Sequence, residues 1–207
     1  MARTVRSMNA IPATHDVRKH ILDVAYPLML RKGFTGVGLA EVLSTAQVPK
    51  GSFYHYFGSK EAFGEAVLEA YFSDYLLHVD ALMAQPGSGA QRLIAYFEDW
   101  REAQTGSDPE GRCLVVKLGA EVCDLSEPMR AALDRGTGAV IARLARCIER
   151  GRADGSLAAA PDPQTTARTL YQNWIGASLL AKIQRGSEPM VQAMAGTRLL
   201  LGLPAQS

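Results

Sequence analysis

The sequence predicts an all-α protein, with an N-terminal three-helix domain that carries a helix-turn-helix and a larger C-terminal helical domain. Apolar residues recur at helical spacing through most of the chain, and no stretch alternates steadily between apolar and polar residues. Only the N-terminal third is basic: residues 1–60 carry a net charge of +5 and residues 61–207 a net charge of −4. The pattern predicts a disordered basic arm over 1–15, then domains over 16–60 and 61–207.

Composition limits the class of protein further. With 47% hydrophobic and 21% charged residues, the chain can bury a globular core. Its three cysteines are an odd number and too few for a disulfide framework, so free thiols in a reducing compartment are expected. No apolar run follows Arg3 and Arg6, and none approaches the roughly 20 residues of a membrane helix. We therefore expect a cytoplasmic protein that does not bind membranes.

The first helix is expected from about Asp16 to Lys32, followed by Gly33, which stops it. Pro27 lies inside this segment and is expected to bend it, because proline lacks a backbone donor. The residues at helical spacing are apolar, as for a helix with one buried face: Ile21, Leu22, Ala25, Leu28 and Met29.

Two short helices are expected over 39–46 and 50–57, with the connector Gln47-Val48-Pro49 between them. Leu39, Val42 and Leu43 supply a small core, and Val48 fills the gap between the helices. Two helices joined by a turn of three or four residues form a helix-turn-helix, whose second helix enters the major groove of DNA.

The remaining helices follow from caps and breakers. Ser59 is expected to cap a long helix that runs to about Met83, and residues 85–89 (QPGSG) form a linker. Further helices are expected over about 90–104 and 113–123, from the cap at Ser126 to about 153, and over 163–185 and 188–201. Gly136 and Gly138 weaken the helix that starts at Ser126 without ending it.

The second short helix and the residues after it are rich in hydrogen-bond donors, which is the chemistry needed to bind phosphates and base edges. Lys60 also lies in the first turn of a helix, where free backbone N–H groups favour a phosphate. The alternative is that Tyr54, Tyr56 and Phe57 are simply core aromatics. The candidate DNA contacts are Lys50, Ser52, Tyr54, His55, Tyr56 and Lys60.

The run KGSFYHYFGSKEAF, together with Gly33-Phe34 before it, resembles the signature of the TetR family of bacterial repressors. The resemblance covers about 50 residues. It implies an all-helical homodimer that binds a pseudo-palindromic operator in double-stranded DNA, and a C-terminal domain that binds an inducer and releases the DNA. It also assigns DNA contacts to the six donors. Three positions depart from the family pattern, namely Gly38, Gln47 and Pro49.

Cys113 is the candidate sensor residue. If a helix begins near it, the helix dipole, Arg112 and Lys117 one turn later all favour a thiolate, which reacts with electrophiles and oxidants. The alternative is that Cys113 is a small buried hydrophobe.

Residues 112–127, with Ala181-Lys182-Ile183 and Glu188-Pro189, resemble the branch of the family that responds to N-ethylmaleimide or acrylate. The resemblance implies that Cys113 is the sensor and Lys182 its partner, and that the inducer is a small electrophilic or unsaturated carbonyl or carboxylate compound. Arg112 departs from the glycine usual there. The rival is a reversible ligand whose carboxylate pairs with Lys182 or Arg112, in a pocket lined by Tyr96, Trp100, Tyr171, Asn173 and Trp174.

The last two expected helices carry apolar residues at helical spacing, which ordinarily indicates core within one chain. The family resemblance instead assigns these helices to the dimer interface, as a four-helix bundle between subunits.

Enzymatic activity is not expected, because the sequence has no phosphate-binding glycine loop, no paired metal-binding histidines and no serine nucleophile elbow. His15, His20, His55 and His78 are dispersed, and none lies after Cys113 to serve as its base. No cofactor or metal is expected. A helical adaptor that binds only protein is the alternative from another class, but it leaves the basic aromatic segment unexplained.

Overall fold

The computed structural model describes residues 14–106, 113–158 and 162–204. The arm expected over 1–15 lies almost wholly outside these ranges. Within them, no helix is both long and apolar enough to span a bilayer. The fold is all-helical, as predicted, and the described residues form nine helices: α1 (Thr14–Lys32), α2 (Leu39–Ala46), α3 (Lys50–Phe57), α4 (Lys60–Met83), α5 (Gly89–Thr105), α6 (Leu114–Cys123), α7 (Glu127–Ala153), α8 (Pro163–Gln184) and α9 (Glu188–Leu200).

Local capping explains where several helices begin. The side chains of Ser59 and Ser126 accept hydrogen bonds from the amides of Ala62 and Met129, at the starts of α4 and α7. A capping box between Ser88 and Gln91 opens α5. The starts of α4 and α7 lie where the sequence predicts them, whereas α5 begins at Gly89, the last residue of the predicted linker.

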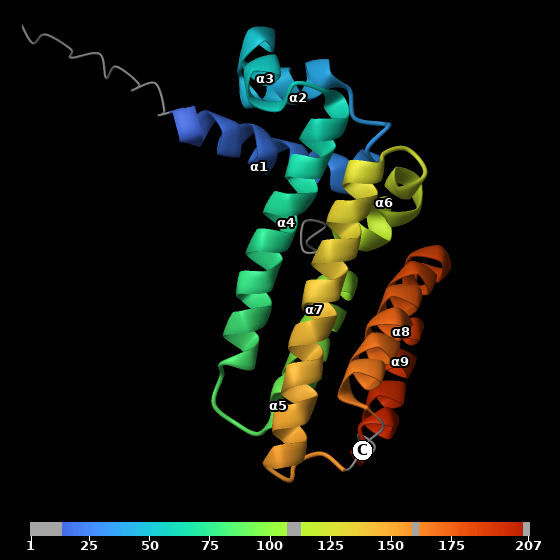
Figure 1. Cartoon of the computed structure of the whole chain (residues 1–207). Helices are drawn as coiled ribbons and strands as arrows, with labels where there is room; N and C mark the ends of the chain where they lie inside the picture. Colours follow the sequence, from blue (N-terminus) through green and yellow to red (C-terminus); the bar gives the residue numbers. More distant parts are fainter. Residues whose placement is uncertain (1–13, 107–112, 159–161, 205–207) are drawn as a thin grey trace, which may run out of the picture.

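The helices form an elongated molecule with α1, α2 and α3 at one end (Figure 1). The long helices α4 and α7 run side by side down its length, and α5 packs against α7. Helices α8 and α9 lie together along the opposite side from α4. The short helix α6 lies beside the end of α1 and the start of α7, between the two ends of the molecule.

Two hydrophobic cores hold this arrangement. The first joins α1, α2 and α3 to the first half of α4, to α6 and to the start of α7; Phe53, Phe63 and Met129 are among its most buried members. The second lies between α5, α7, α8 and α9, around Phe97 and Trp174. The first core therefore continues across residue 60, the boundary expected from the sequence.

The turn between α2 and α3 accommodates a residue other than glycine. Gln47 adopts the left-handed conformation with φ of 55°, and the Val48 amide donates to the Leu43 carbonyl at 3.1 Å. This conformation costs a residue with a Cβ about 1–2 kcal/mol. The last carbonyl of α2, on Ala46, accepts from Nε2 of His20 at 3.0 Å, so α1 stabilises the turn from outside.

Gly136 allows α4 and α7 to pack closely. A Cβ at this position would lie 2.2 Å from the Phe72 ring, whereas one at Gly138, two residues later in the same helix, would meet nothing within 4 Å.

We expect Gly136→Ala to lower the free energy of unfolding by about 1–3 kcal/mol through overpacking. Gly138→Ala, the matched control, should raise it by about 0.5–1 kcal/mol, because alanine is the better helix former. Urea unfolding at one fixed protein concentration measures both. Equal effects of the two substitutions would contradict the packing described for α4 and α7.

Candidate functional sites

Helix α3 buries one face and leaves the other open. Phe53 and Phe57 are 0% and 7% exposed, whereas Tyr54 is 51% exposed. The core-aromatic alternative therefore applies to Phe57 but not to Tyr54. The other candidate contacts are exposed or partly exposed, as DNA-contacting side chains must be: Lys50, Ser52, His55, Tyr56 and Lys60.

Aromatic and cationic contacts fix the orientation of α3. The rings of Phe53 and Phe57 pack on Phe63 of α4, with centroids 5.1 and 4.9 Å away. The Arg18 guanidinium of α1 lies over the Phe57 ring at 5.3 Å, and Lys60 Nζ lies 4.9 Å from the Phe34 ring centroid. The donors on the open face are thus carried by a helix whose other side is firmly packed.

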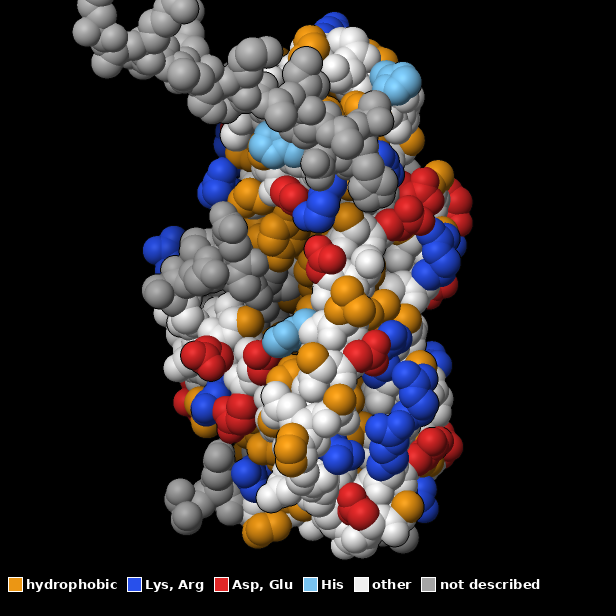
Figure 2. Space-filling model, turned by 90° about the vertical axis from the view of Figure 1, so that its left-hand side faces the viewer, with side chains coloured by type: hydrophobic (Ala, Val, Ile, Leu, Met, Phe, Trp, Pro, Cys, Tyr) orange, Lys and Arg blue, Asp and Glu red, His pale blue; other side chains and the backbone are white. Residues whose placement is uncertain are grey.

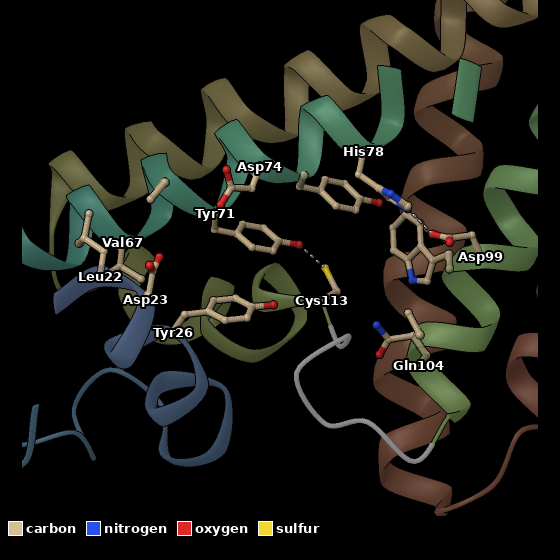
Figure 3. A pocket seen from close by; sticks show the side chains of 14 residues that line it. Leu22, Asp23, Tyr26, Val67, Tyr71, Asp74, His78, Asp99, Gln104 and Cys113 are labelled. Atoms are coloured by element: carbon tan, nitrogen blue, oxygen red, sulfur yellow. Dashed lines mark hydrogen bonds and ion pairs between the residues drawn. The ribbon is translucent and has the colours of Figure 1, made fainter. Parts of the chain in front are cut away.

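A cavity of about 490 Å³ lies between α1, α4 and α5, beside the helix-turn-helix (Figures 2 and 3). Three tyrosine rings stack along one wall: Tyr26 on Tyr71 at 5.8 Å, and Tyr71 on Tyr75 at 5.7 Å. Its described lining contains no Lys or Arg and three acids, Asp23, Asp74 and Asp99. We call it the aromatic cavity.

A second cavity, of about 600 Å³, lies between the ends of α1 and α8 and the start of α6. Its described lining contains no Asp or Glu but four cationic side chains, Arg31, Lys117, Lys182 and Arg185. We call it the basic cavity. Cys113 is among the lining residues of both cavities.

Cys113 is the N-cap residue of α6 and is partly exposed. The Tyr71 hydroxyl donates to its Sγ at 3.8 Å (Figure 3). Burial raises the pKa of the Cys113 thiol, and this outweighs the amides of Val116 and Val115 and the Tyr71 hydroxyl, which act in the opposite direction. This direction is opposite to the one that the helix terminus and the nearby cations predict for Cys113.

The three residues predicted to surround Cys113 differ in what the structure shows of them. Arg112 is outside the described residues, and Lys117 directs its ammonium to the Arg31 carbonyl at 3.1 Å. Lys182 lines the basic cavity, so the predicted sensor and its partner share one cavity wall.

Of the five residues predicted to line a ligand pocket, only Trp100 lines one of the two cavities. Trp100 lines the aromatic cavity, and its indole N–H donates to Ser178 at 3.1 Å. Tyr96, Tyr171 and Trp174 are packed in the second core, and Asn173 lies on an exposed face of α8. The tyrosines that do line the aromatic cavity were not predicted, although Tyr71 and Tyr75 are four residues apart and so share one helix face.

The other two cysteines differ from Cys113. Cys123 is exposed at the end of α6. Cys147 is buried, donates to the Gly89 carbonyl at 3.6 Å, and has its pKa raised by burial to about 11.

Helix α6 also holds the junction between α1 and α2. The Glu121 carboxylate accepts hydrogen bonds from the amides of Phe34 at 3.1 Å and Thr35 at 2.7 Å, and from the Thr35 hydroxyl. Although burial alone would raise the pKa of Glu121, these bonds and the charge of Lys117 lower it, so the carboxylate is ionised at neutral pH. With the bond from Lys117 to Arg31, α6 binds the chain on both sides of Gly33. We call these contacts the α6 clamp.

The exposed donor face of a helix-turn-helix, joined to a helical body with cavities, defines a ligand-responsive DNA-binding regulator. Residues 21–67 match the family described as bacterial regulatory proteins, tetR family, and residues 89–197 match the tetracyclin repressor-like C-terminal domain. The chain belongs to the TetR family of DNA-binding transcriptional repressors, which are not enzymes. The match of both domains leaves no support for a protein-binding adaptor.

Three curated relatives are similar over most of the chain. The HTH-type transcriptional repressor NemR of Escherichia coli K12 is 46% identical, over 92% of this chain and 96% of its own. Transcriptional regulator AcuR of Cereibacter sphaeroides is 34% identical, over 78% of this chain and 74% of its own. The HTH-type transcriptional repressor DhaR of Mycobacterium sp. (strain GP1) is 33% identical, over 85% of this chain and 87% of its own. The crystal structure of reduced E. coli NemR superposes with a TM-score of 0.87, covering 93% of this chain and 100% of that one at 44% identity.

If the six donors contact DNA as the α3 face predicts, two substitutions should act differently. Lys60→Gln should weaken binding to all duplexes alike and lower the slope of log K against log salt by about 0.9, the value for one lost phosphate contact. Ser52→Ala should instead change the preference among duplexes selected from a random library. Arg168→Gln, which removes one exposed charge on α8, is the control and should do neither. Identical effects of Lys60→Gln and Ser52→Ala would contradict the assignment.

Proposed function

We propose that this repressor is released from its operator by a small electrophilic or unsaturated carbonyl or carboxylate compound that is sensed through Cys113. The observation that carries the proposal is the position of the Cys113 sulfur, at the N-terminus of α6 and in the wall of two cavities. The aromatic cavity is large enough for a small organic molecule. A compound bound there lies against the only cysteine among its described lining residues.

The covalent step is a conjugate addition. The Cys113 sulfur forms a bond to the β-carbon of the unsaturated compound, and the π electrons of its C=C bond move to the α-carbon. That carbon takes up a proton in place of the one that the thiol loses. Because Cys113 is the residue from which α6 starts, the adduct occupies space at one end of the helix whose other contacts form the α6 clamp.

A reversible ligand is the second candidate. The stacked Tyr26, Tyr71 and Tyr75, with Trp100, offer an aromatic surface on which an unreactive planar compound could bind without any reaction of Cys113. The two candidates differ in whether the thiol is needed for release.

The same proposal assigns DNA binding and inducer binding to largely different parts of the chain. Residues 16–60 read the operator through the open face of α3. Residues 61–207 bind the second subunit and, together with α1 residues such as Tyr26 in the cavity wall, the inducer. Since the first core joins α3 to α6 through α1 and α4, a displacement of α6 reaches the DNA-reading helices through packed contacts as well as through the α6 clamp.

The proposed repressor acts as a homodimer through α8 and α9. Many of the apolar residues at helical spacing on these helices, such as Leu170 and Met194, are buried within one chain. A different face is open, and it is apolar, as an interface between copies would be. Its exposed residues are Leu179, Leu180, Ile183, Val191, Leu199 and Leu200.

Release through Cys113 predicts that N-ethylmaleimide and acrylate lower operator affinity in wild type and in Cys123→Ser, but not in Cys113→Ser. The rate of release should rise as pH rises through and beyond about 8.5, the pKa of an ordinary thiol, because burial raises the pKa of Cys113. Fluorescence anisotropy with a selected operator duplex gives the rate, and peptide mass spectrometry locates the adduct. Full release of Cys113→Ser would favour the reversible ligand.

The dimer proposal predicts that Ile183→Glu combined with Leu199→Glu gives a monomer at micromolar concentration in sedimentation velocity. These side chains are 67% and 82% exposed, so the substitutions should leave the fold of one chain intact. Leu77→Glu, at an equally exposed leucine of α4 (67%), should leave the dimer unchanged. A wild-type chain that sediments as a monomer would exclude this interface.

A further inference from the structure

The cationic side chains of the basic cavity have no role in the proposed reaction of Cys113. Its four cations come from three helices and the residue after one of them: Arg31 from α1, Lys117 from α6, Lys182 from α8 and Arg185 at the C-cap of α8. No Asp or Glu is among the described residues that line the cavity. Cationic side chains converging on one cavity create a positive potential that favours an anionic ligand.

Lys117 connects this cavity to the DNA-reading end. It lines the cavity and also donates to the Arg31 carbonyl at 3.1 Å, in the last turn of α1, where helix carbonyls lack intrahelical partners. Its charge also helps to hold the pKa of Glu121 down, one turn further along α6. Lys117 thus supports both halves of the α6 clamp.

We propose that the basic cavity is a binding site for a small oxyanion, a carboxylate or a phosphate group, and that Lys117 transmits its occupancy to the DNA-binding helices. The inference rests on the proposed function of inducer-controlled release but does not require reaction of Cys113. In this proposal the cationic side chains of the basic cavity bind the anion.

The physical basis is competition for one ammonium group. The hydrogen bond from the Lys117 ammonium to the Arg31 carbonyl is already strengthened by the charge of its donor. An anion in the cavity adds a direct attraction between opposite charges that a neutral carbonyl lacks, and so shifts the Lys117 ammonium relative to Arg31. It also offsets the positive charge that stabilises the Glu121 carboxylate. Both effects loosen the hold of α6 on the turn between α1 and α2.

A saturated acid separates this site from the thiol, because it cannot alkylate cysteine. Operator affinity of the full-length Cys113→Ser protein is measured by fluorescence anisotropy at constant ionic strength, with millimolar propionate, benzoate or inorganic phosphate. Propionamide, the neutral counterpart of propionate, is the control ligand. We expect at least one anion to weaken operator binding by about tenfold, a typical allosteric coupling, and propionamide to have no effect. Response to phosphate alone would identify a phosphate-bearing ligand, and response to the acids a carboxylate.

Substitutions then test the residues. Lys117→Met should abolish the response to the anion, and Arg185→Met should shift the response to higher anion concentration. Arg168→Met, at an exposed position of α8 outside the basic cavity, should respond as the parent does. Retention of helical circular dichroism and of operator binding by Arg185→Met keeps the test valid even if Lys117→Met does not fold.

The inference is overturned if no anion acts, if propionamide acts as strongly as propionate, or if Lys117→Met responds fully. These outcomes are distinct from failure of thiol sensing. Release by N-ethylmaleimide of a protein that contains Cys113, without any anion response, removes only the anion site. An anion response without release by N-ethylmaleimide removes only the thiol mechanism.

Discussion

The Glu121 carboxylate, bound to the amides of Phe34 and Thr35, is the interaction on which the coupling in this structure depends. Gly33 makes the approach feasible: its φ of +81° ends α1, and a Cβ there would lie 2.7 Å from Glu121 Oε2. Hydrogen bonds to a charged group contribute about 1.5–3 kcal/mol each, less where solvent screens them as at this partly exposed site. The clamp is therefore strong enough to position the helix-turn-helix and weak enough for a ligand to release it.

Packing supports the same coupling. The core around Phe53, Phe63 and Met129 includes side chains from α1, α2, α3, α4, α6 and α7. The DNA-reading helices therefore do not form an independently packed domain. Helix α6 belongs to that core through Leu114, Leu118 and Val122, while its N-cap Cys113 lies in the wall of both cavities. A close-packed interior resists gradual deformation, so a small displacement at Cys113 is passed on to the DNA-reading end.

Local signals were sufficient to predict the helices, and the exposed donors of α3 follow from the helix-turn-helix pattern. Tertiary effects were not predictable in this way. The prediction of a thiolate at Cys113 was based on the helix terminus and nearby cations. Burial by residues from other helices instead raises the pKa of the thiol. Tyr96, Tyr171 and Trp174 are of residue types that often line ligand pockets, but here they are packed in the second hydrophobic core. Glu121 carries no local signal at all, because its partners lie 86 and 87 residues earlier in the chain.

Two cavities share the lining residue Cys113. We propose that this repressor reaches the α6 clamp in two ways, through a covalent change at Cys113 and through a charge change at Lys117. The most direct test of this coupling is amide hydrogen exchange in Cys123→Ser, before and after N-ethylmaleimide modifies Cys113. We expect faster exchange of the Phe34 and Thr35 amides after modification, with no change at Gln91 in the capping box of α5. Unchanged exchange at Phe34 and Thr35 in fully modified protein would contradict this coupling.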